Sequence, residues 1–133
     1  MKKVLIVEDD KSVLRFLQIV LGTKFEVITA GNVEEAKLKF NENLNDLAAI
    51  FLDGNIPENG LPGCFQTETV ILAREFKAKF FGPMVAISGH ERVQSTLMTI
   101  CNIDCAKPIL LDRLQQVADE INNSSVRSTP GSL

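Results

Sequence analysis

Short apolar runs alternate along the chain with segments whose apolar residues recur at helical spacing. The apolar runs have the length and composition of strands buried on both faces; they are residues 4–7, 25–29, 48–52, 84–87 and 103–106. Each run is followed by a segment with apolar positions three or four residues apart, which predicts an amphipathic helix. The predicted helices cover residues 13–21, 33–40, 65–80, 91–100 and 111–121. The chain therefore alternates strand and helix five times.

Three polar or small residues mark where these helices begin and end. Asp10 is interpreted as an ordinary acidic residue at a helix N-terminus, where the helix dipole favours negative charge. Asn32, with Glu35 three residues on, predicts a helix start in which the Asn side chain caps and Glu35 reaches back to its backbone. Gly22 follows the first helix, at the position that often adopts a left-handed conformation.

Short connections between fully buried strands predict a parallel sheet with right-handed crossovers and helices on both faces. For five strands we expect an α/β, flavodoxin-like, doubly wound sheet of order 2-1-3-4-5. A closed eight-fold barrel needs about 250 residues, more than the 133 present. We expect one domain over residues 1–122. Turn-forming residues make 54–63 a loop, and 123–133 is expected to be a flexible tail, a linker stump or a cloning remnant.

Composition narrows the classes of protein further. With 45% hydrophobic and 23% charged residues the chain can build a core, and a domain of this size needs no disulfides. The net charge of −3 and pI near 5.2 argue against a surface for nucleic-acid phosphates. No apolar run approaches the ~20 residues of a membrane span. These features predict a cytoplasmic protein that binds neither nucleic acid directly nor membrane.

Polar residues follow four of the five predicted strands. Glu8 and Asp9 follow the first strand, Asp53 the third, Ser88 the fourth and Lys107 the fifth. Ligands of doubly wound sheets bind beyond the carboxyl ends of the strands, so these side chains are expected to converge. Three carboxylates in one pocket repel each other unless positive charge lies among them. Lys107 supplies one charge, and oxygen ligands favour Mg²⁺ as a second source.

These residue types suit phosphoryl transfer. Asp53 can act as a nucleophile and form an aspartyl-phosphate, while Mg²⁺ and the Lys107 ammonium balance the charge of the phosphoryl oxygens. Ser88 offers a hydroxyl donor. The backbone amides of Gly54 and Gly89 can approach closely because glycine has no Cβ. Taken singly, each residue also has an ordinary structural interpretation, but four strand ends with complementary chemistry favour a phosphoryl site.

The sequence resembles the receiver domain of bacterial two-component response regulators, the fold of the chemotaxis regulators, over residues 2–122. The motifs that carry the resemblance are Val7-Glu8-Asp9-Asp10, Leu52-Asp53 with Pro57, Ser88 after Val-Ala-Ile, and Lys107-Pro108. The 44-residue step between the two key acids (53 − 9) is also typical of that family.

The resemblance assigns a role to each site residue. It implies that Asp53 accepts the phosphoryl group and that Asp9 binds Mg²⁺ directly. Glu8 would bind the ion largely through water, and Asn55 would bind it through its backbone carbonyl. Ser88 would hydrogen-bond the phosphoryl group and Lys107 would pair with its charge, with a cis peptide joining Lys107 to Pro108.

The resemblance also implies partners. A histidine kinase or phosphotransfer protein would supply the phosphoryl group, and a downstream protein or output domain would read the conformational change. A homodimer could form through the fourth helix, fifth strand and fifth helix. Apart from catalysing its own phosphorylation and dephosphorylation, such a domain is not an enzyme. Whether the receiver is free-standing or part of a larger protein stays open.

The chain departs from the family pattern in ways that keep an alternative open. Asp104 occupies the position three residues before the lysine, where receivers usually have Tyr or Phe. The 35-residue interval from Asp53 to Ser88 (88 − 53) is longer than usual, and the 19-residue interval from Ser88 to Lys107 (107 − 88) is shorter. The alternative is a pseudo-receiver that binds partners without phosphorylation. An aspartate phosphatase is disfavoured because Asp53-Gly54-Asn55 lacks the second acid, and a flavin site because acids follow the first strand.

Three cysteines and one histidine give no clear metal site. Cys101 and Cys105 are four residues apart, with Cys64 and His90 as possible companions, whereas zinc ligands are usually paired more closely. We expect buried or half-buried thiols that pack as small apolar groups. His90 is expected to be an exposed loop residue at the mouth of the phosphoryl site.

Overall fold

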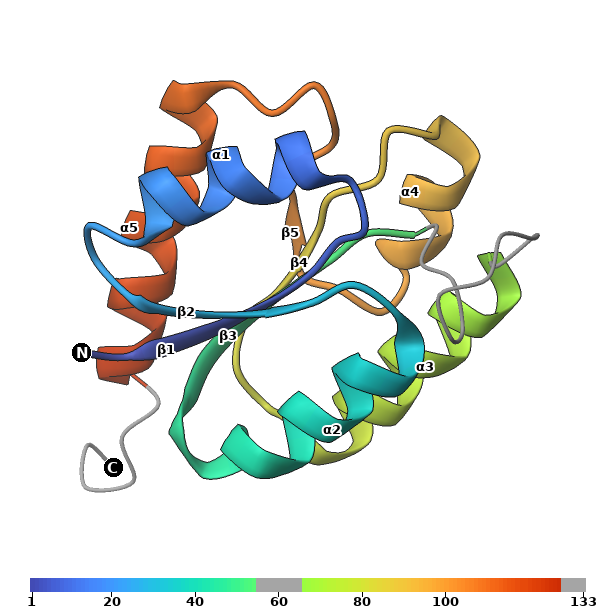
Figure 1. The fold of residues 1–133 in the computed structure, drawn as a ribbon, viewed down its shortest axis with the longest axis horizontal. Coiled ribbons are helices and arrows are strands. Elements are labelled where there is room, and N and C mark those ends of the chain that lie inside the picture. The colour runs from blue at the N-terminus through green and yellow to red at the C-terminus, as the bar shows by residue number, and fades with distance from the viewer. Residues whose placement is uncertain (55–65, 128–133) are drawn as a thin grey trace.

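A single parallel sheet forms the centre of the molecule (Figure 1). The computed structural model describes residues 1–54 and 66–127. Its strands are β1 (Lys3–Val7), β2 (Glu26–Ala30), β3 (Leu47–Leu52), β4 (Met84–Ala86) and β5 (Ile103–Asp104). The order is β2-β1-β3-β4-β5, with every neighbouring pair parallel. This confirms the doubly wound sheet of order 2-1-3-4-5.

Helices cover both faces of the sheet. They are α1 (Lys11–Leu21), α2 (Val33–Asn43), α3 (Gln66–Lys79), α4 (Glu91–Leu97) and α5 (Leu111–Arg127), with a short 3₁₀ turn at Leu44–Asp46. In Figure 1, α1 and α5 lie together on one face, and α2 and α3 lie on the opposite one. Because β1, β3 and β4 are parallel neighbours, their carboxyl ends lie at the same edge of the sheet, between these two layers of helices.

Each face of the sheet has its own apolar core because successive side chains of a strand point to opposite faces. In β1, Leu5 and Val7 pack with the core under α2, α3 and α4. Val4 and Ile6 pack with the core under α1 and α5. All four are completely buried, which explains why the strand is an uninterrupted apolar run.

Both predicted N-caps are confirmed, but the described residues show no hydrogen bond from the Asn32 amide to the Glu35 side chain, and the conformation predicted for Gly22 is wrong. Asp10 caps α1 by accepting hydrogen bonds from the amides of Ser12 and Val13, and Asn32 caps α2 by accepting one from Glu35. Gly22 has right-handed dihedral angles, φ −63° and ψ −15°. A Cβ at this position would lie 2.5 Å from the carbonyl oxygen of Gln18, so close packing of the backbone, not handedness, favours glycine here.

Several boundaries differ from those predicted. β4 ends at Ala86, β5 contains only Ile103 and Asp104, and α4 ends at Leu97. We expected a loose chain from Asn122, but α5 continues to Arg127. The loop predicted over residues 54–63 lies outside the described residues except for Gly54.

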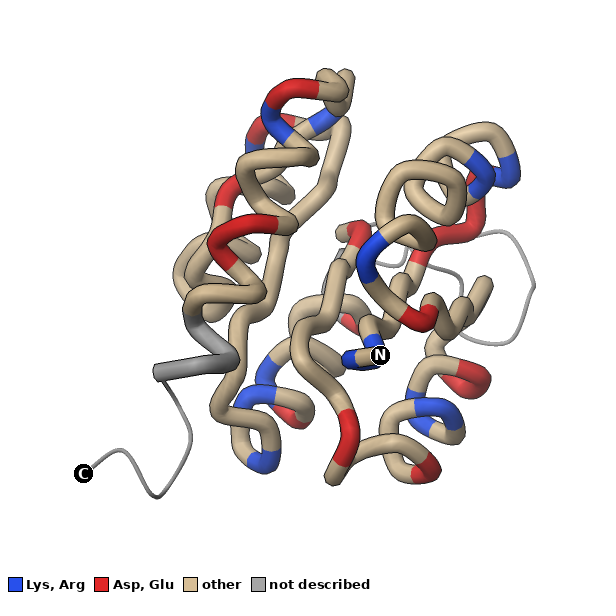
Figure 2. Tube along the Cα trace, turned by 90° about the vertical axis from the view of Figure 1, so that its left-hand side faces the viewer, with Lys and Arg blue, Asp and Glu red and all other residues tan. Residues whose placement is uncertain are grey.

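The distribution of charge is mixed. Figure 2 shows Lys and Arg interspersed with Asp and Glu on the face that it presents, without the continuous basic stripe that nucleic-acid binding favours. Within residues 1–54 and 66–127, no helix is long and apolar enough to cross a membrane.

Candidate functional site

The two residues that follow β1, Glu8 and Asp9, are both acidic. The Glu8 amide donates to the carbonyl of Ala30 at 3.0 Å, so the end of β2 fixes the backbone of this acid. The Glu8 side chain is completely buried, and its Oε2 accepts a hydrogen bond from the Asp9 amide at 3.2 Å. Asp9 itself is exposed. One acid is thus placed inside the protein and its neighbour at the surface.

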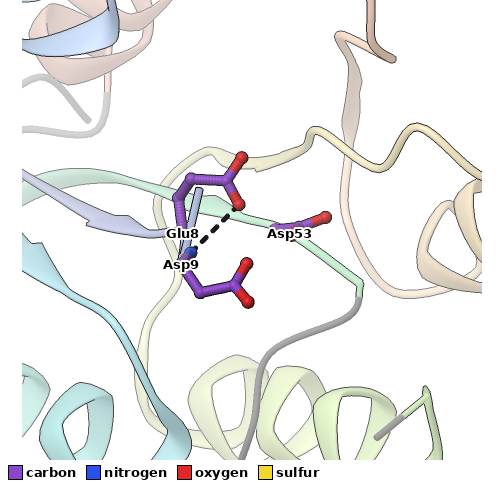
Figure 3. A group of neighbouring side chains, drawn as sticks. All are labelled: Glu8, Asp9 and Asp53. Atoms are coloured by element: carbon purple, nitrogen blue, oxygen red, sulfur yellow. Dashed lines mark hydrogen bonds between the residues drawn. The ribbon is translucent and has the colours of Figure 1, made fainter. Parts of the chain in front are cut away.

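Asp53 lies beside these acids because β1 and β3 are adjacent. Its amide donates to the carbonyl of Val7, the residue that precedes Glu8, at 3.0 Å. Its side chain is only 6% exposed. One carboxylate oxygen from each of Glu8, Asp9 and Asp53 lies within 4.8 Å of the other two. Figure 3 shows the three side chains gathered where β1 and β3 end, as the sequence predicted.

Lys107 brings positive charge to this cluster. Its Nζ lies 2.5 Å from Glu8 Oε1 and 3.5 Å from Asp53 Oδ2. Its amide donates to the carbonyl of Ser88 at 3.1 Å, which ties the segment after β5 to the segment after β4. The Lys107–Pro108 peptide is cis, as expected. Lys107 thus lies among the acids, as the sequence predicted, and its role toward a phosphoryl group stays a prediction.

Burial and repulsion between carboxylates make Glu8 and Asp9 harder to ionise than free acids. Burial, followed by the neighbouring Asp53 carboxylate, raises the pKa of Glu8 to about 8, and Lys107 offsets only part of that effect. Burial and Asp53 also raise the pKa of Asp9. Burial lowers the pKa of Lys107, but its contacts with Glu8 and Asp53 outweigh this and leave it above its ordinary value. A divalent cation among the carboxylates would lower the cost of ionising them.

The three carboxylates fit a hard divalent cation. Oxygen ligands from only a few side chains, with one of the acids open to solvent, match the way that Mg²⁺ keeps several of its waters. Within the described residues, Glu8 Oε1 is the buried side-chain atom without a hydrogen-bond partner, since its contact with Lys107 is an ion pair. This oxygen is already paired with Lys107, so what favours a cation is the group of three carboxylate oxygens that lie within 4.8 Å of one another.

Ser88 is buried at the same edge of the sheet but contacts other groups. Its Oγ accepts a hydrogen bond from the His90 amide at 3.1 Å, and it lies close to the segment after Asp53, because a Cβ on Gly54 would approach it to 3.4 Å. The hydroxyl is thus adjacent to the acid cluster without bonding to it. Asn55, assigned to the metal from the resemblance, lies outside the described residues.

The sequence did not single out Gln94, which is bound to Ser88. Gln94 is only 7% exposed. Its Oε1 accepts from the Ser88 amide at 2.8 Å, and its Nε2 donates to the Ala86 carbonyl at 2.8 Å and to Asp104 Oδ1 at 2.7 Å. A signal was available: Gln94 lies beside Val93 and three residues before Leu97, on the face of α4 that packs inward.

The two described cysteines and His90 have the burial that the sequence predicted. Cys101 and Cys105 are buried, and they belong to the cores on opposite faces of the sheet. Burial raises the pKa of Cys101 to about 12 and also raises that of Cys105. His90 is exposed at the start of α4. Cys64 lies outside the described residues.

Comparisons with known proteins identify the fold. The chain is similar in structure to the N-terminal domain of an uncharacterised protein from Wolinella succinogenes, with 23% identity, a TM-score of 0.76, and coverage of 97% of this chain and 100% of that one. It is also similar to a response regulator receiver domain protein from Clostridium thermocellum, at 23% identity and TM-score 0.73, covering 96% of both chains.

A CheY-like response regulator receiver domain from Methylobacillus flagellatus matches at 18% identity and TM-score 0.70, covering 91% of this chain and 98% of that one. Neither the models of protein families nor the curated proteins give a match to the sequence. The likeness is therefore one of fold, and it extends over nearly the whole chain.

Proposed function

We propose that this chain, which has the fold of response regulator receiver domains, receives a phosphoryl group on Asp53 and signals through the resulting change of conformation. The donor is a histidine kinase or a phosphotransfer protein, acting in the cytoplasm. The observation that carries the proposal is the meeting of Asp53, two further carboxylates and the Lys107 ammonium at one edge of the sheet.

Asp53 is the nucleophile of the proposed reaction. One of its carboxylate oxygens attacks the phosphorus of a phosphohistidine, a P–O bond forms and the P–N bond breaks, and the leaving imidazole keeps the electron pair. Asp53 is almost buried and lies next to Glu8, so its carboxylate is close to a second acidic group. Phosphorylation of Asp53 adds further negative charge at the same place. Neighbouring cations therefore decide whether the product is stable.

Lys107 and the acids supply that stabilisation. Lys107 Nζ, 3.5 Å from Asp53 Oδ2, neutralises charge on the phosphoryl oxygens from a fixed position. Mg²⁺, when bound, neutralises charge on the oxygens of the transferring group, and Glu8, Asp9, Asp53 and the Asn55 carbonyl are its proposed ligands. Ser88 is proposed to turn its hydroxyl, which donates to the His90 carbonyl oxygen at 3.4 Å, toward a phosphoryl oxygen. The same groups would assist hydrolysis, so the domain catalyses reactions of its own phosphoryl group only.

The test is phosphorylation by a small donor. The protein is incubated with acetyl phosphate and Mg²⁺ and its intact mass is measured. We expect a gain of one phosphoryl group that disappears in Asp53→Asn and when the metal is chelated. Asp112→Asn, a change in the first turn of α5, is the matched control and should gain the phosphoryl group normally. A gain that persists in Asp53→Asn, or no gain at all, contradicts the proposal.

A pseudo-receiver that binds its partners without phosphorylation is the second candidate. It is favoured by Asp104 in place of the usual aromatic residue and by the bond that holds Asp104 to Gln94. A partner that binds the wild type and Asp53→Asn equally, with no mass gain from acetyl phosphate, would support this candidate. For either candidate we propose a single folded unit that extends past residue 122, the expected boundary, to the end of α5 at Arg127. We also propose that the face of α4, β5 and α5 contacts a target or a second copy of the chain.

A further inference from the structure

One buried amide side chain joins three elements around Ser88. Gln94 in α4 binds the Ser88 amide with Oε1, and its Nε2 binds both the Ala86 carbonyl at the end of β4 and the Asp104 carboxylate in β5. Both donor hydrogens and the acceptor are thereby used. Since a buried polar group without a partner is costly, Gln94 cannot lose one of these bonds without the others adjusting.

The connection continues from Asp104 to the surface of α5. Arg113 donates to the Asp104 carbonyl oxygen from Nε at 3.2 Å and from Nη2 at 2.8 Å. Arg113 Nη1 also lies 3.3 Å from Glu120 Oε1. A continuous series of polar contacts thus runs from Ser88 through Gln94 and Asp104 to Arg113. Its first member is buried beside the acid cluster and its last is half-buried at the surface of α5.

The surroundings of this series leave space for movement. Ser88, Gln94, Asp104 and Lys107 line a common open cavity of about 350 Å³. On the other side, α4 packs tightly on the segment after Asp53, because a Cβ on Gly54 would lie 2.0 Å from Val93 Cγ1. A movement of the segment after Asp53 is therefore transmitted to α4 through the tight contact with Val93. The cavity beside Gln94 leaves room for the side chains that line it to move.

We propose that Gln94 is a positioning residue that couples Ser88 to the surface formed by Asp104 and Arg113. This inference rests on the proposed function. When Ser88 moves toward a phosphoryl group on Asp53, its amide carries the Gln94 side chain along, and the hydrogen bond from Gln94 to Asp104 changes. Asp104 then shifts, and its backbone carbonyl moves relative to the Arg113 side chain that binds it. Information about the site reaches the α4, β5 and α5 face through hydrogen bonds.

Three variants isolate the link to Asp104. Asp104→Ala removes the acceptor of Gln94 Nε2 but keeps the carbonyl that binds Arg113. Asp104→Asn is the matched control, because its side-chain oxygen can still accept from Gln94. Gln94→Leu has a similar size but loses all three hydrogen bonds. Each protein is labelled with ¹⁵N, and backbone amide shifts are recorded before and after adding Mg²⁺ with beryllium fluoride, a phosphoryl mimic.

In the wild type we expect amide shifts at Ser88, Asp104 and Arg113. In Asp104→Ala the Ser88 shift should remain and the Arg113 shift should be lost, and in Asp104→Asn both should remain. Gln94→Leu should also lose the Arg113 shift. A role in stability alone would not remove a ligand-dependent shift from one residue while sparing another. If Gln94→Leu does not fold, the comparison between Asp104→Ala and Asp104→Asn decides the question.

An Arg113 shift in Asp104→Ala equal to that in the wild type would overturn the coupling. The same holds for a wild type in which Ser88 responds and Arg113 does not, and in that case the proposed function still stands. A wild type with no response at Ser88 and no phosphoryl gain from acetyl phosphate would overturn both. The two failures are therefore distinguished by the response of Ser88.

Discussion

Lys107 Nζ lies 2.5 Å from Oε1 of Glu8, a side chain with no exposed surface. The lysine side chain is 22% exposed, so the pair places one charge inside the protein and the other near its surface. A buried charge that loses its partner costs more than the pair itself contributes. The ion pair therefore lowers the free-energy cost of burying the acid cluster. The same lysine also supplies the positive charge that the proposed phosphoryl transfer needs.

Replacing the lysine should destabilise the protein. Lys107→Met removes the cation near both Glu8 and Asp53, and we expect the free energy of unfolding to fall by about 3 kcal/mol. Lys24→Met is the control, because the 2.8 Å pair of Lys24 with Asp119 is exposed and should contribute about 1 kcal/mol or less. Urea unfolding without divalent cations at about pH 9, above the pKa of about 8 of Glu8, measures both variants with the carboxylate ionised. Equal losses of unfolding free energy in the two variants would show that the buried Glu8–Lys107 pair contributes no more to stability than an exposed pair.

Asp9 and its neighbour Asp10 are predicted to respond differently to Mg²⁺. Asp9→Asn removes one of three clustered carboxylates, so the protein without metal should become more stable while its stabilisation by Mg²⁺ decreases. Tenfold weaker binding lowers that stabilisation by about 1.4 kcal/mol at saturating metal. Asp10→Asn keeps a good helix cap and should leave the Mg²⁺ effect unchanged. Unfolding with and without Mg²⁺ measures both, and equal effects in the two variants would contradict the assignment.

The fold and most of the site were predictable because both depend on where strands end. Continuous apolar runs identify strands buried on both faces, and strand order then determines which end residues meet. Glu8, Asp53 and Lys107 follow directly from this, since each comes within a few residues of the last apolar position of a strand. No precise side-chain geometry is needed to predict that they converge.

The features that were missed depend on partners from several elements. Gln94 is buried because Ser88, Ala86 and Asp104 satisfy it together, and none of these bonds follows from helical periodicity. The conformation of Gly22 was wrongly predicted because glycine is compatible with both right- and left-handed helix ends. The end of α5 at Arg127 was missed because local propensity is a weak guide where Asn and Ser continue a helix.

Gly54 is predicted to be intolerant of a side chain. A Cβ there would lie 2.0 Å from Val93 Cγ1, so Gly54→Ala forces α4 or Val93 to move and should cost about 1–3 kcal/mol of unfolding free energy. At Gly31 a Cβ would meet nothing within 4 Å, which makes Gly31→Ala the control, with an effect of about 1 kcal/mol or less. Adding Val93→Ala to Gly54→Ala should recover stability. Additive losses in the double variant would mean that the clash is not the cause.

Cys101 is predicted to be protected from alkylation up to high pH. Burial raises its pKa to about 12, and the thiolate is the reactive form. In a Cys64→Ser background, iodoacetamide should modify Cys101 far more slowly in the native protein than in urea, and the native rate should keep rising with pH above 9, the ordinary pKa of the thiol. Mass spectrometry of the digested protein measures the two rates at each pH.

The same shift determines the sign of the contribution that Cys101 makes to stability. Between pH 9 and about 12 the folded chain keeps a proton that the unfolded chain has lost. The contribution of Cys101 is therefore fully present below pH 9 and decreases as the pH rises through that window. Cys101→Ala should be less sensitive to pH in this range than the wild type. Equal pH dependence, or equally fast alkylation in native and unfolded protein, would show that the thiol is accessible.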